Sequence, residues 1–491
     1  MKKLTHITRV RRTARFLFRP ISAALGLVLA ASVGQAQAPR QPNIILIVSD
    51  DHGREAIGAY GNRVIRTPNI DALARDSVRF DQAYAATSSC SPSRASILTG
   101  RMSHNTGMYG LQHDPNHFAV YDRVQSLPAL LAAGGYRTAS IGKWHIAPDS
   151  VFPFQEILFR AGINPLDSLG RNPVKMADMS AGFIGKSDAP FFLYFAPEDP
   201  HRAYPFEIGG KPNSFGNKPG GFSGVRTTSY KPSDVIVPPF LPDVPAVREE
   251  LAQYYQSVSR VDDGIGRLIA ALKAAGKYEN TLILYLSDNG AAFPTAKTTL
   301  YDPGIHVPLI VHAPGSASRG LASSAMVSLT DIAPTILDYA GVAGPKEPMD
   351  GRSFRPVIDR PATAGWDEIY ATHTFHEILQ YYPMRMVRTR QYKLIYNIAW
   401  PLEYPDTLDL HYSSTWLSFL ASGSEMFGPR PIKQFLHRPK FELYDLDRDP
   451  LEVKNLAEDP RYENVREDLI GKLRAFQERS NDPWIRKWTF E

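Results

Sequence analysis

The sequence predicts an α/β protein in which helices sandwich a large, mostly parallel β-sheet, followed by a smaller α+β subdomain. Two observations carry this prediction. Short apolar runs recur along the first two thirds of the chain, and most end in a cluster of polar residues. Segments of helical period lie between these runs. Such alternation is typical of strands that are buried on both faces of a parallel sheet.

Five apolar runs are long enough to form buried strands. They lie at residues 43–48, 138–141, 191–195, 281–286 and 307–312. Parallel sheets bind ligands beyond the carboxyl ends of their strands. The polar clusters that follow the first four runs are therefore expected at one edge of the sheet.

Helices are predicted where apolar residues recur with helical spacing between start and stop signals. The predicted helices span residues 68–79, 126–133 with Gly134 as the stop, 246–275 with Gly264 as a candidate break, and 328–340. Residues 206–245 are rich in Gly, Pro, Ser and Lys, which predicts a long surface excursion, a candidate rim of the site.

The pattern changes near residue 350. Beyond it, short strands are predicted at 384–387 and 394–396, and an amphipathic helix near 463–479. We therefore expect a catalytic domain over residues 39–350 and an α+β subdomain over residues 351–491. A hydrophobic content of 43% is ordinary for a globular protein of this size.

Residues 1–38 have the features of a secretory signal peptide, with a basic start, an apolar run at 21–31 and small residues at 35–38. The apolar run is too short to anchor the chain across a bilayer. This segment holds seven Lys and Arg and no acid, so its removal takes the formal net charge from +5 to −2. A nucleic-acid or membrane-surface role then lacks compositional support. We expect an exported protein, periplasmic or secreted, with no membrane attachment after cleavage.

Cys90 is the only cysteine of the chain, and it begins the run Cys-Ser-Pro-Ser-Arg at 90–94, followed by Leu-Thr-Gly-Arg at 98–101. A lone cysteine cannot form an internal disulfide, which points to chemistry, although an isolated cysteine is ordinarily a small buried hydrophobe. Pro92 occupies a position that suits the first turn of a helix. Cys90 is then expected at a helix N-terminus, where the free N–H groups favour an anion.

Two of the predicted strand ends carry oxygen ligands. Asp50 and Asp51 follow the first run, and Asp288 and Asn289 follow the run at 281–286. Three carboxylates held together need a cation, and oxygen ligands suit Ca²⁺ or Mg²⁺. Taken separately, the first pair is equally typical of a helix cap and the second of a turn.

Together these motifs resemble the sulfatase family, whose signature is C-x-P-S-R-x-x-x-L-T-G-R. In that family a separate formylglycine-generating enzyme oxidises the cysteine to formylglycine, and the hydrated aldehyde is the nucleophile. The resemblance implies one Ca²⁺ held by Asp50, Asp51, Asp288 and Asn289. It also implies that the catalytic residues are Cys90, Arg94, Lys143, His145, His201 and Lys297.

The implied reaction has two stages. Arg94, Lys143 and the metal stabilise the attacking oxygen, and Lys143, Lys297 and the metal neutralise the sulfate oxygens. His201, together with Lys297, protonates the departing atom. His145 then takes the proton of the second hydroxyl, so that sulfate leaves. For Arg94, a surface salt bridge is the alternative.

The resemblance extends almost to the end of the chain, through residues 441–445 and 449–456. Within the family the chain is most similar to the sulfamidases, the branch that hydrolyses N-sulfoglucosamine. This similarity rests on residues 107–111, 199–202, 289–294 and 376–385. Trp144 and Lys297 depart from the sulfamidase pattern of Lys and Arg, and Lys lacks the planar fork of Arg. The implied substrate is an N-sulfated glucosamine saccharide, with an O-sulfated polysaccharide as the alternative.

His376, Glu377 and Arg385 lie in the sulfamidase-like part and are predicted to bind the sugar. Glu377 would accept from hydroxyls, and Arg385 would reach a uronic acid or a second sulfate. Alternatively, these two residues pair with each other at a domain seam.

Two other classes of protein stay open. A phosphatase or phosphodiesterase of the same superfamily would need two metal ions and more His and Asp ligands. A polysaccharide-binding protein without activity would not need this nucleophile.

Overall fold

The computed structural model describes residues 41–162, 168–203, 206–208, 211–405 and 407–490. The predicted signal peptide lies outside these residues. Gln41–Glu491 form one compact unit, and the boundary expected near residue 350 stays a prediction. None of the described helices combines the length and apolarity needed to cross a membrane.

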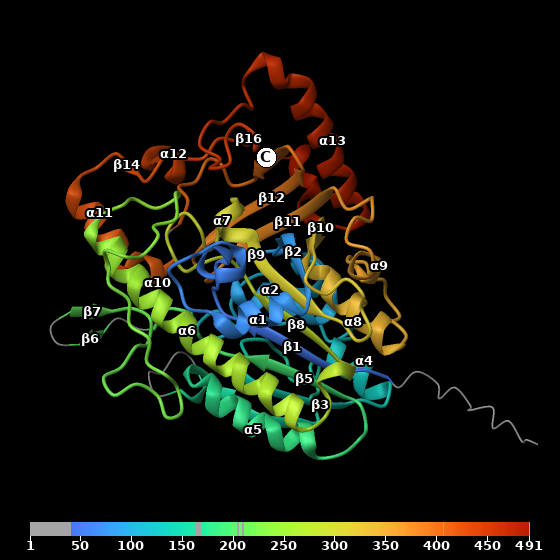
Figure 1. Cartoon of the computed structure of the whole chain (residues 1–491). Coiled ribbons are helices and arrows are strands. Elements are labelled where there is room, and N and C mark those ends of the chain that lie inside the picture. The colour runs from blue at the N-terminus through green and yellow to red at the C-terminus, as the bar shows by residue number, and fades with distance from the viewer. Residues whose placement is uncertain (1–40, 163–167, 204–205, 209–210, 406, 491) are drawn as a thin grey trace, which may run out of the picture. The chain divides into compact units, whose positions relative to one another are not determined.

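An eight-stranded mixed sheet forms the centre of the molecule, in the order β10-β2-β9-β8-β1-β5-β3-β4 (Figure 1). Its strands are β1 (Asn43–Ser49), β2 (Val78–Tyr84), β3 (Arg137–Lys143), β4 (Glu156–Ala161), β5 (Phe191–Ala196), β8 (Thr281–Ser287), β9 (His306–His312) and β10 (Ala322–Ser328). All neighbouring strands run parallel except where β9 meets β8 and β2. The predicted mostly parallel sheet is confirmed.

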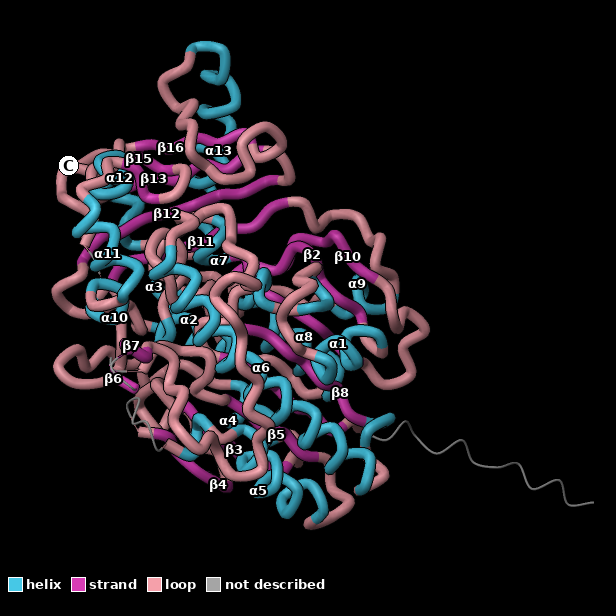
Figure 2. Tube along the Cα trace, turned by 60° about the vertical axis from the view of Figure 1, so that its left-hand side comes forward, coloured by secondary structure: helices cyan, strands magenta, loops and turns pink. Residues whose placement is uncertain are grey.

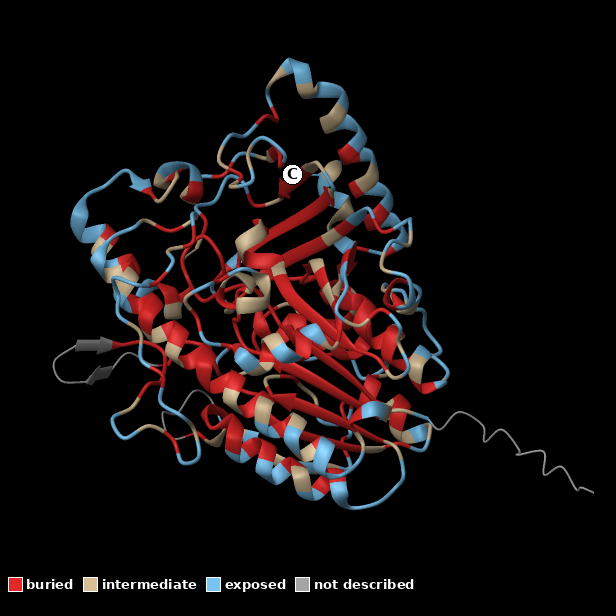
Figure 3. Ribbon diagram, in the orientation of Figure 1, coloured by how far each residue is buried: buried red, intermediate tan, exposed pale blue. Residues whose placement is uncertain are grey.

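The central strands are buried on both faces, as Figure 3 shows. Alternate residues of a strand point to opposite faces, so β1 divides its side chains between two cores. Ile44 and Leu46 belong to one core, and Ile45 and Ile47 to the other. Helices α2 (Cys90–Thr99), α4 (Leu127–Ala133) and α8 (Ile332–Ala340) cover the first, and α1 (Pro68–Arg75), α5 (Pro173–Gly185) and α6 (Pro245–Ala274) cover the second.

Three of the helix predictions need correction. The helix predicted at 328–340 begins only at Ile332, because Ser328 ends β10 and residues 329–331 form a 3-10 turn. The first helix ends at Arg75 rather than at 79, because Val78 and Arg79 pair with β9 as the start of β2. Helix α6 continues through Gly264 without a break. A Cβ there would lie 2.3 Å from the Cβ of Pro173, so this glycine serves the close approach of α5 rather than ending a helix.

A second, four-stranded antiparallel sheet lies in the C-terminal part, in the order β11-β12-β13-β16 (Figure 2). Its strands are β11 (Glu368–Phe375), β12 (Tyr381–Thr389), β13 (Tyr392–Asn397) and β16 (Phe441–Asp445). Helix α13 (Glu463–Arg479) packs on it through Leu473 and Phe476. The strands expected at 384–387 and 394–396 and the final helix are confirmed.

The remaining elements are short. They are α3 (Ser103–Thr106), β6 (Phe206–Ile208), β7 (Lys211–Asn213), α7 (Asp302–Ile305), α9 (Arg355–Asp359), α10 (Leu408–His411), α11 (Ser414–Ser422), β14 (Met426–Phe427), β15 (Arg430–Pro431) and α12 (Ile432–Leu436). The excursion expected at 206–245 begins with the β6–β7 hairpin. Its later residues, including Phe215 and Leu241, pack against Leu251 and Tyr254 of α6.

Candidate active site

The order of the sheet brings four strand ends together. Strands β8, β1, β5 and β3 are neighbours and run parallel, so their carboxyl ends share one edge. Backbone hydrogen bonds join the segments just beyond them, from Asp50 N–H to the Asp199 carbonyl (3.3 Å) and from Asp288 N–H to the Ser49 carbonyl (3.2 Å). The polar clusters predicted at separate strand ends therefore form a single site.

Cys90 is the first residue of α2, as the Pro92 signal predicts, and it is 1% exposed. Its Sγ lies 3.8 Å from Oδ1 of Asp51. Burial raises the pKa of the Cys90 thiol well above its usual value, although Lys143 and Lys297 oppose this. An unmodified Cys90 is therefore a protonated thiol, which is a poor nucleophile.

Three buried carboxylates lie next to Cys90. Asp50, Asp51 and Asp288 each offer an oxygen within 4.8 Å of the others. The Nδ2 of Asn289 donates to Oδ1 of Asp51 (2.7 Å) and to the Gly290 carbonyl (2.9 Å). This leaves Oδ1 of Asn289 buried with no hydrogen-bond partner, and Oδ1 of Asp50 likewise has none, although Arg94 Nη2 lies 3.4 Å from it. Buried oxygens that lack donors are suitable ligands for a hard divalent cation, so this set fits a metal.

Three cationic side chains face these carboxylates. Arg94 Nε lies 2.8 Å from Asp288 Oδ2, Lys143 Nζ pairs with Asp50 Oδ2, and Lys297 Nζ lies 2.9 Å from Asp51 Oδ2. Burial acts to raise the pKa of Asp50, but Lys143 and the other cations outweigh it and hold this pKa well below its usual value. Burial raises the pKa of Asp288 to about 7 even beside Arg94.

Lys297 is at the centre of a further cluster. Its Nζ lies 3.2 Å from Nε2 of His201 and 2.7 Å from Oδ2 of Asp409. The other ring nitrogen of His201, Nδ1, lies 2.6 Å from the Arg202 carbonyl and so carries the proton that it donates. Burial lowers the pKa of His201 well below its usual value, and Lys297 adds to this. His201 is thus neutral and accepts a hydrogen bond from the Lys297 ammonium.

His145 pairs with a second histidine. Its Nε2 lies 2.7 Å from Nδ1 of His113, and the two rings stack with centroids 4.9 Å apart. Nδ1 of His145 is buried and has no hydrogen-bond partner. Burial, with Lys143 next in effect, lowers the pKa of His145 well below its usual value.

These groups open into a cavity of about 800 Å³. Cys90, Lys143, His145 and His201 lie on its wall, together with His376, Glu377 and Asp409 from the C-terminal part. His376 Nδ1 lies 2.9 Å from the hydroxyl of Ser89, the residue before α2. Glu377 is half-buried and accepts from Nε2 of Gln380 (3.0 Å). The cavity-lining residues come from other segments than the excursion at 211–245, so its described part does not supply the expected rim.

Arg385 does not reach this cavity. It is fully buried on β12, where Nε and Nη2 hold both oxygens of Asp482 at 2.5 and 2.9 Å. Its Nη1 donates to the carbonyls of His373 and Met384. Four of the five N–H donors of Arg385 are used in this way and its side chain is fully buried, so it is not placed to bind a substrate in the cavity. The alternative pairing of Arg385 with Glu377 is not formed either.

Sequence reasoning missed two residues of the site, His113 and Asp409. His113 lies two residues beyond the sulfamidase-like segment 107–111, so a search of the flanking residues for imidazoles would have found it. Asp409 carries no local signal, because only the fold brings it to Lys297.

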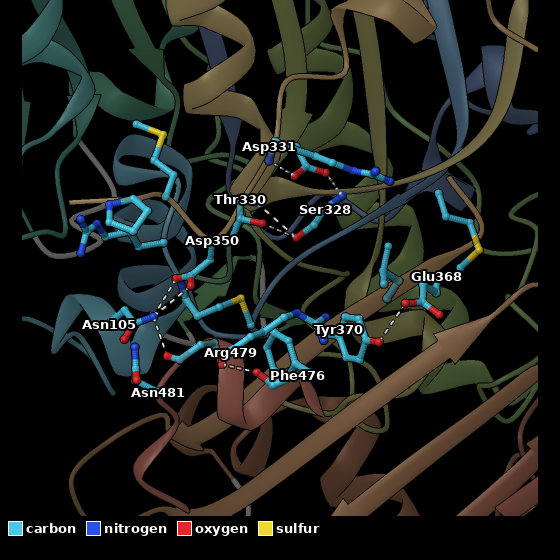
Figure 4. A pocket seen from close by; sticks show the side chains of 18 of the residues that line it. Asn105, Ser328, Thr330, Asp331, Asp350, Glu368, Tyr370, Phe476, Arg479 and Asn481 are labelled. Atoms are coloured by element: carbon cyan, nitrogen blue, oxygen red, sulfur yellow. Dashed lines mark hydrogen bonds between the residues drawn. The ribbon is translucent and has the colours of Figure 1, made fainter. Parts of the chain in front are cut away.

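A second cavity, of about 980 Å³, lies at the far end of α2 (Figure 4). The side chains drawn there pair with one another, as Asn105 does with Asp350 and Tyr370 with Glu368. None of the predicted catalytic residues lines it. Size alone therefore does not locate the active site.

Residues 42–342 match the sulfatase family, and residues 295–412 match the C-terminal family of N-sulphoglucosamine sulphohydrolase. The chain belongs to the sulfatase family. It is accordingly a hydrolase that releases sulfate.

Curated relatives cover nearly the whole chain. It is 38% identical to human N-sulphoglucosamine sulphohydrolase, over 95% of each protein. It is 26% identical to the N-acetylglucosamine-6-O-sulfatase of Bacteroides thetaiotaomicron, over 94% of this chain and 91% of the relative. A solved structure in complex with D-glucosamine-2-N,6-O-disulfate has the same fold, with a TM-score of 0.66 and 23% identity over 90% of this chain and 99% of that one.

Proposed function

We propose that this sulfatase is a sulfamidase that releases sulfate from terminal N-sulfated glucosamine, using formylglycine at position 90 and one Ca²⁺. The observation that carries the proposal is the 38% identity to human N-sulphoglucosamine sulphohydrolase along 95% of both chains. The C-terminal match at 295–412 supports it, because this part supplies His376, Glu377 and Asp409 to the cavity.

Asp50, Asp51, Asp288 and Asn289 would hold the cation, which when bound polarises the nucleophile and the sulfate oxygens. The orphaned oxygens of Asp50 and Asn289 support this assignment. The ligand set is all oxygen, which favours Ca²⁺ over zinc.

Modification of Cys90 by a formylglycine-generating enzyme would supply a hydrated aldehyde, with one hydroxyl to attack sulfur and a second to be deprotonated for sulfate release. The raised thiol pKa of Cys90 supports the need for this change, since the thiol itself is a weak nucleophile. The N-terminus of α2 would direct its free N–H groups toward the sulfate.

The chain's own side chains would then carry out the proton and charge steps. Arg94 and Lys143 neutralise charge beside the nucleophile. His201, together with Lys297, would protonate the departing nitrogen, because Nε2 of His201 accepts from the Lys297 ammonium and His201 lies on the cavity wall. His145 would accept the proton of the second hydroxyl.

His376 and Glu377 would contact the sugar from the C-terminal side of the cavity. We assign them a positioning role, because none of the hydrogen bonds or ion pairs of the described residues joins either one to Cys90 or to the acidic cluster. We further propose that residues 1–38 direct export to the periplasm or beyond, with no membrane attachment after cleavage.

The experiment is a screen of purified protein against N-sulfated glucosamine and a panel of O-sulfated saccharides. Release of sulfate from the N-sulfated substrate is expected, with Cys90→Ala as the inactive control. If O-sulfated substrates alone are cleaved, the sulfamidase assignment is wrong although the chain remains a sulfatase. Mass spectrometry of the peptide around position 90 should reveal loss of the thiol, and an active protein that retains it would refute the formylglycine step.

A further inference from the structure

His145 has one ring nitrogen that is free to accept a proton. Nδ1 is buried and has no hydrogen-bond partner, and Nε2 lies 2.7 Å from Nδ1 of His113. Among the hydrogen bonds of the described residues, His113 is therefore the one neighbour to which His145 can pass a proton. That neighbour, His113, lines the cavity next to Asp114 and Pro115, which are exposed.

The short distance between Nε2 of His145 and Nδ1 of His113 means that these two atoms form a hydrogen bond. One of the two nitrogens must donate and the other must accept. If His145 donates from Nε2, its Nδ1 carries a lone pair and can act as a base toward the nucleophile. His113 then accepts at Nδ1 and carries its own proton on Nε2. An imidazole that accepts on one nitrogen and donates from the other transfers a proton without moving.

We propose that His113 relays to solvent the proton that His145 removes during sulfate release, an inference that rests on the proposed function. The O–H bond of the hydroxyl breaks as a bond to His145 Nδ1 forms. The His145 Nε2–H bond breaks as a bond to His113 Nδ1 forms. The electron pair of the O–H bond forms the C=O bond of the aldehyde as the C–O bond to sulfate breaks, and sulfate leaves with that second pair. The His113 Nε2–H bond breaks and its proton passes to water, so each ring ends in the opposite tautomer. The starting tautomers return when Nδ1 of His145 loses its proton to water in the emptied cavity, the Nδ1 proton of His113 passes back to Nε2 of His145, and Nε2 of His113 takes a proton from water.

The charges around the pair keep both rings neutral at rest, as a relay requires. Burial lowers the pKa of His113, with Lys143 and Lys297 adding to it and Asp114 opposing. The groups that face His145 are Lys143, His113, Asp50 and Arg94. Most of these charges are positive, so a proton arriving on the pair is driven outward rather than held.

A residue that only orients His145 would have a different signature from a relay. Glutamine at 113 keeps a hydrogen bond to His145 but cannot accept on one atom and release from another. Alanine leaves room in the cavity for a free imidazole. The matched control is His117→Ala, because His117 lies on the same segment, is exposed and pairs only with Asp114 among the ion pairs described.

The kinetic test uses an aryl sulfate, whose good leaving group is chosen so that breakdown of the sulfated enzyme becomes the slower stage. We expect His113→Ala and His113→Gln to keep the first-turnover burst and to lose kcat by on the order of tenfold or more, with folding checked by thermal melting. Added imidazole should restore the alanine variant and leave wild type and His117→Ala unchanged. A glutamine variant with full kcat, or an alanine variant that is active without imidazole, would overturn the relay.

A second readout needs no modified cysteine. In Cys90→Ala protein labelled with ¹⁵N-histidine, NMR should detect the proton of His145 on Nε2 and an N–N coupling to His113 that His113→Ala removes. A proton on Nδ1 of His145 would refute the relay, since the buried nitrogen could not act as a base. If wild type releases no sulfate from any substrate, the proposed function fails, and this measurement still tests the hydrogen bond by itself.

Discussion

Two buried charge clusters of this protein look alike in composition and differ in completeness. The catalytic cluster groups Asp50, Asp51 and Asp288 with Arg94, Lys143 and Lys297. The seam cluster joins Arg385 of β12 to Asp482, which lies just beyond α13. Both are buried, yet only the catalytic cluster and the adjoining Asn289 contain oxygens without a hydrogen-bond donor.

The seam cluster leaves neither oxygen of Asp482 without a donor. Asp482 accepts from Arg385, from Nε2 of Gln477 (2.9 Å) and from the backbone N–H of Trp484 (3.1 Å). A buried ion pair of this kind holds two parts of the chain in register but has nothing left to bind a ligand. Charge and burial are therefore common to both clusters. Buried polar atoms without a hydrogen-bond partner distinguish the candidate active site from the structural ion pair.

The largest effect is expected from a substitution that disrupts the catalytic cluster. Asp51→Asn removes a charge that faces both Cys90 and Lys297, so we expect loss of the bound cation and a fall in kcat of on the order of a thousandfold or more. Elemental analysis and sulfate release measure the two results, with about one hard divalent ion per chain expected in wild type. Two tightly bound zinc ions would instead indicate a phosphatase.

Breaking the seam cluster should affect stability and not chemistry. Arg385→Met leaves the Asp482 carboxylate buried without its cation, which we expect to lower the free energy of unfolding by about 3–5 kcal/mol. Denaturant unfolding measures this, and kcat/KM at low temperature should change less than twofold. The double variant with Asp482→Asn should recover part of the loss. A selective rise in KM with Arg385→Met would instead indicate that Arg385 binds the substrate.

A smaller effect is expected at the cavity wall. Glu377→Ala should lower kcat/KM by roughly tenfold, as loss of one charged hydrogen bond to a sugar hydroxyl would. Steady-state kinetics with N-sulfated glucosamine checks this. Glu368→Ala, a carboxylate of the other cavity, is the matched control and should leave kcat/KM unchanged. Equal kcat/KM values for the two variants would show that Glu377 does not bind the substrate.

The smallest effect concerns acid stability near the seam. Burial, with Arg438 and Arg385, lowers the pKa of His373 from 6.5 to about 3. Below pH 6.5 the unfolded chain therefore binds a proton on His373 that the folded protein does not bind. The free energy of unfolding falls as pH decreases from 6.5 toward 3. The loss is about 1 kcal/mol at pH 6 from this histidine. Unfolding curves of His373→Gln should be flatter with pH, whereas the exposed variant His117→Gln should follow wild type.

Much of the catalytic cluster was predictable because it is encoded locally. Apolar runs buried on both faces give parallel strands, and residues that directly follow such strands meet at one edge. Asp50, Lys143, His201 and Asp288 each obey this rule. The start of α2 was equally local, since Pro92 suits a first turn.

The rest depended on contacts between distant segments. Asp409 is 112 residues from its partner Lys297, and Arg385 is 97 residues from Asp482. His113 and His145 are 32 residues apart, and they pair only because the fold brings their two segments together. Gly264 shows the same limit, since glycine suits a helix end and a close helix approach equally well.

By itself, the sequence determined the fold class, the place of Cys90 at the start of α2 and the strand ends that carry the acidic residues, because strand burial and helix starts depend on neighbouring residues. Only the tertiary structure decided which partners each buried charge contacts. Arg385 and Lys297 are both buried cations, but Arg385 pairs with Asp482 away from the cavity, while Lys297 contacts His201, which lies on the cavity wall. These partners are brought together by packing between distant segments. Because removing a charge from water is costly, each buried charge needs the partner that the fold places beside it.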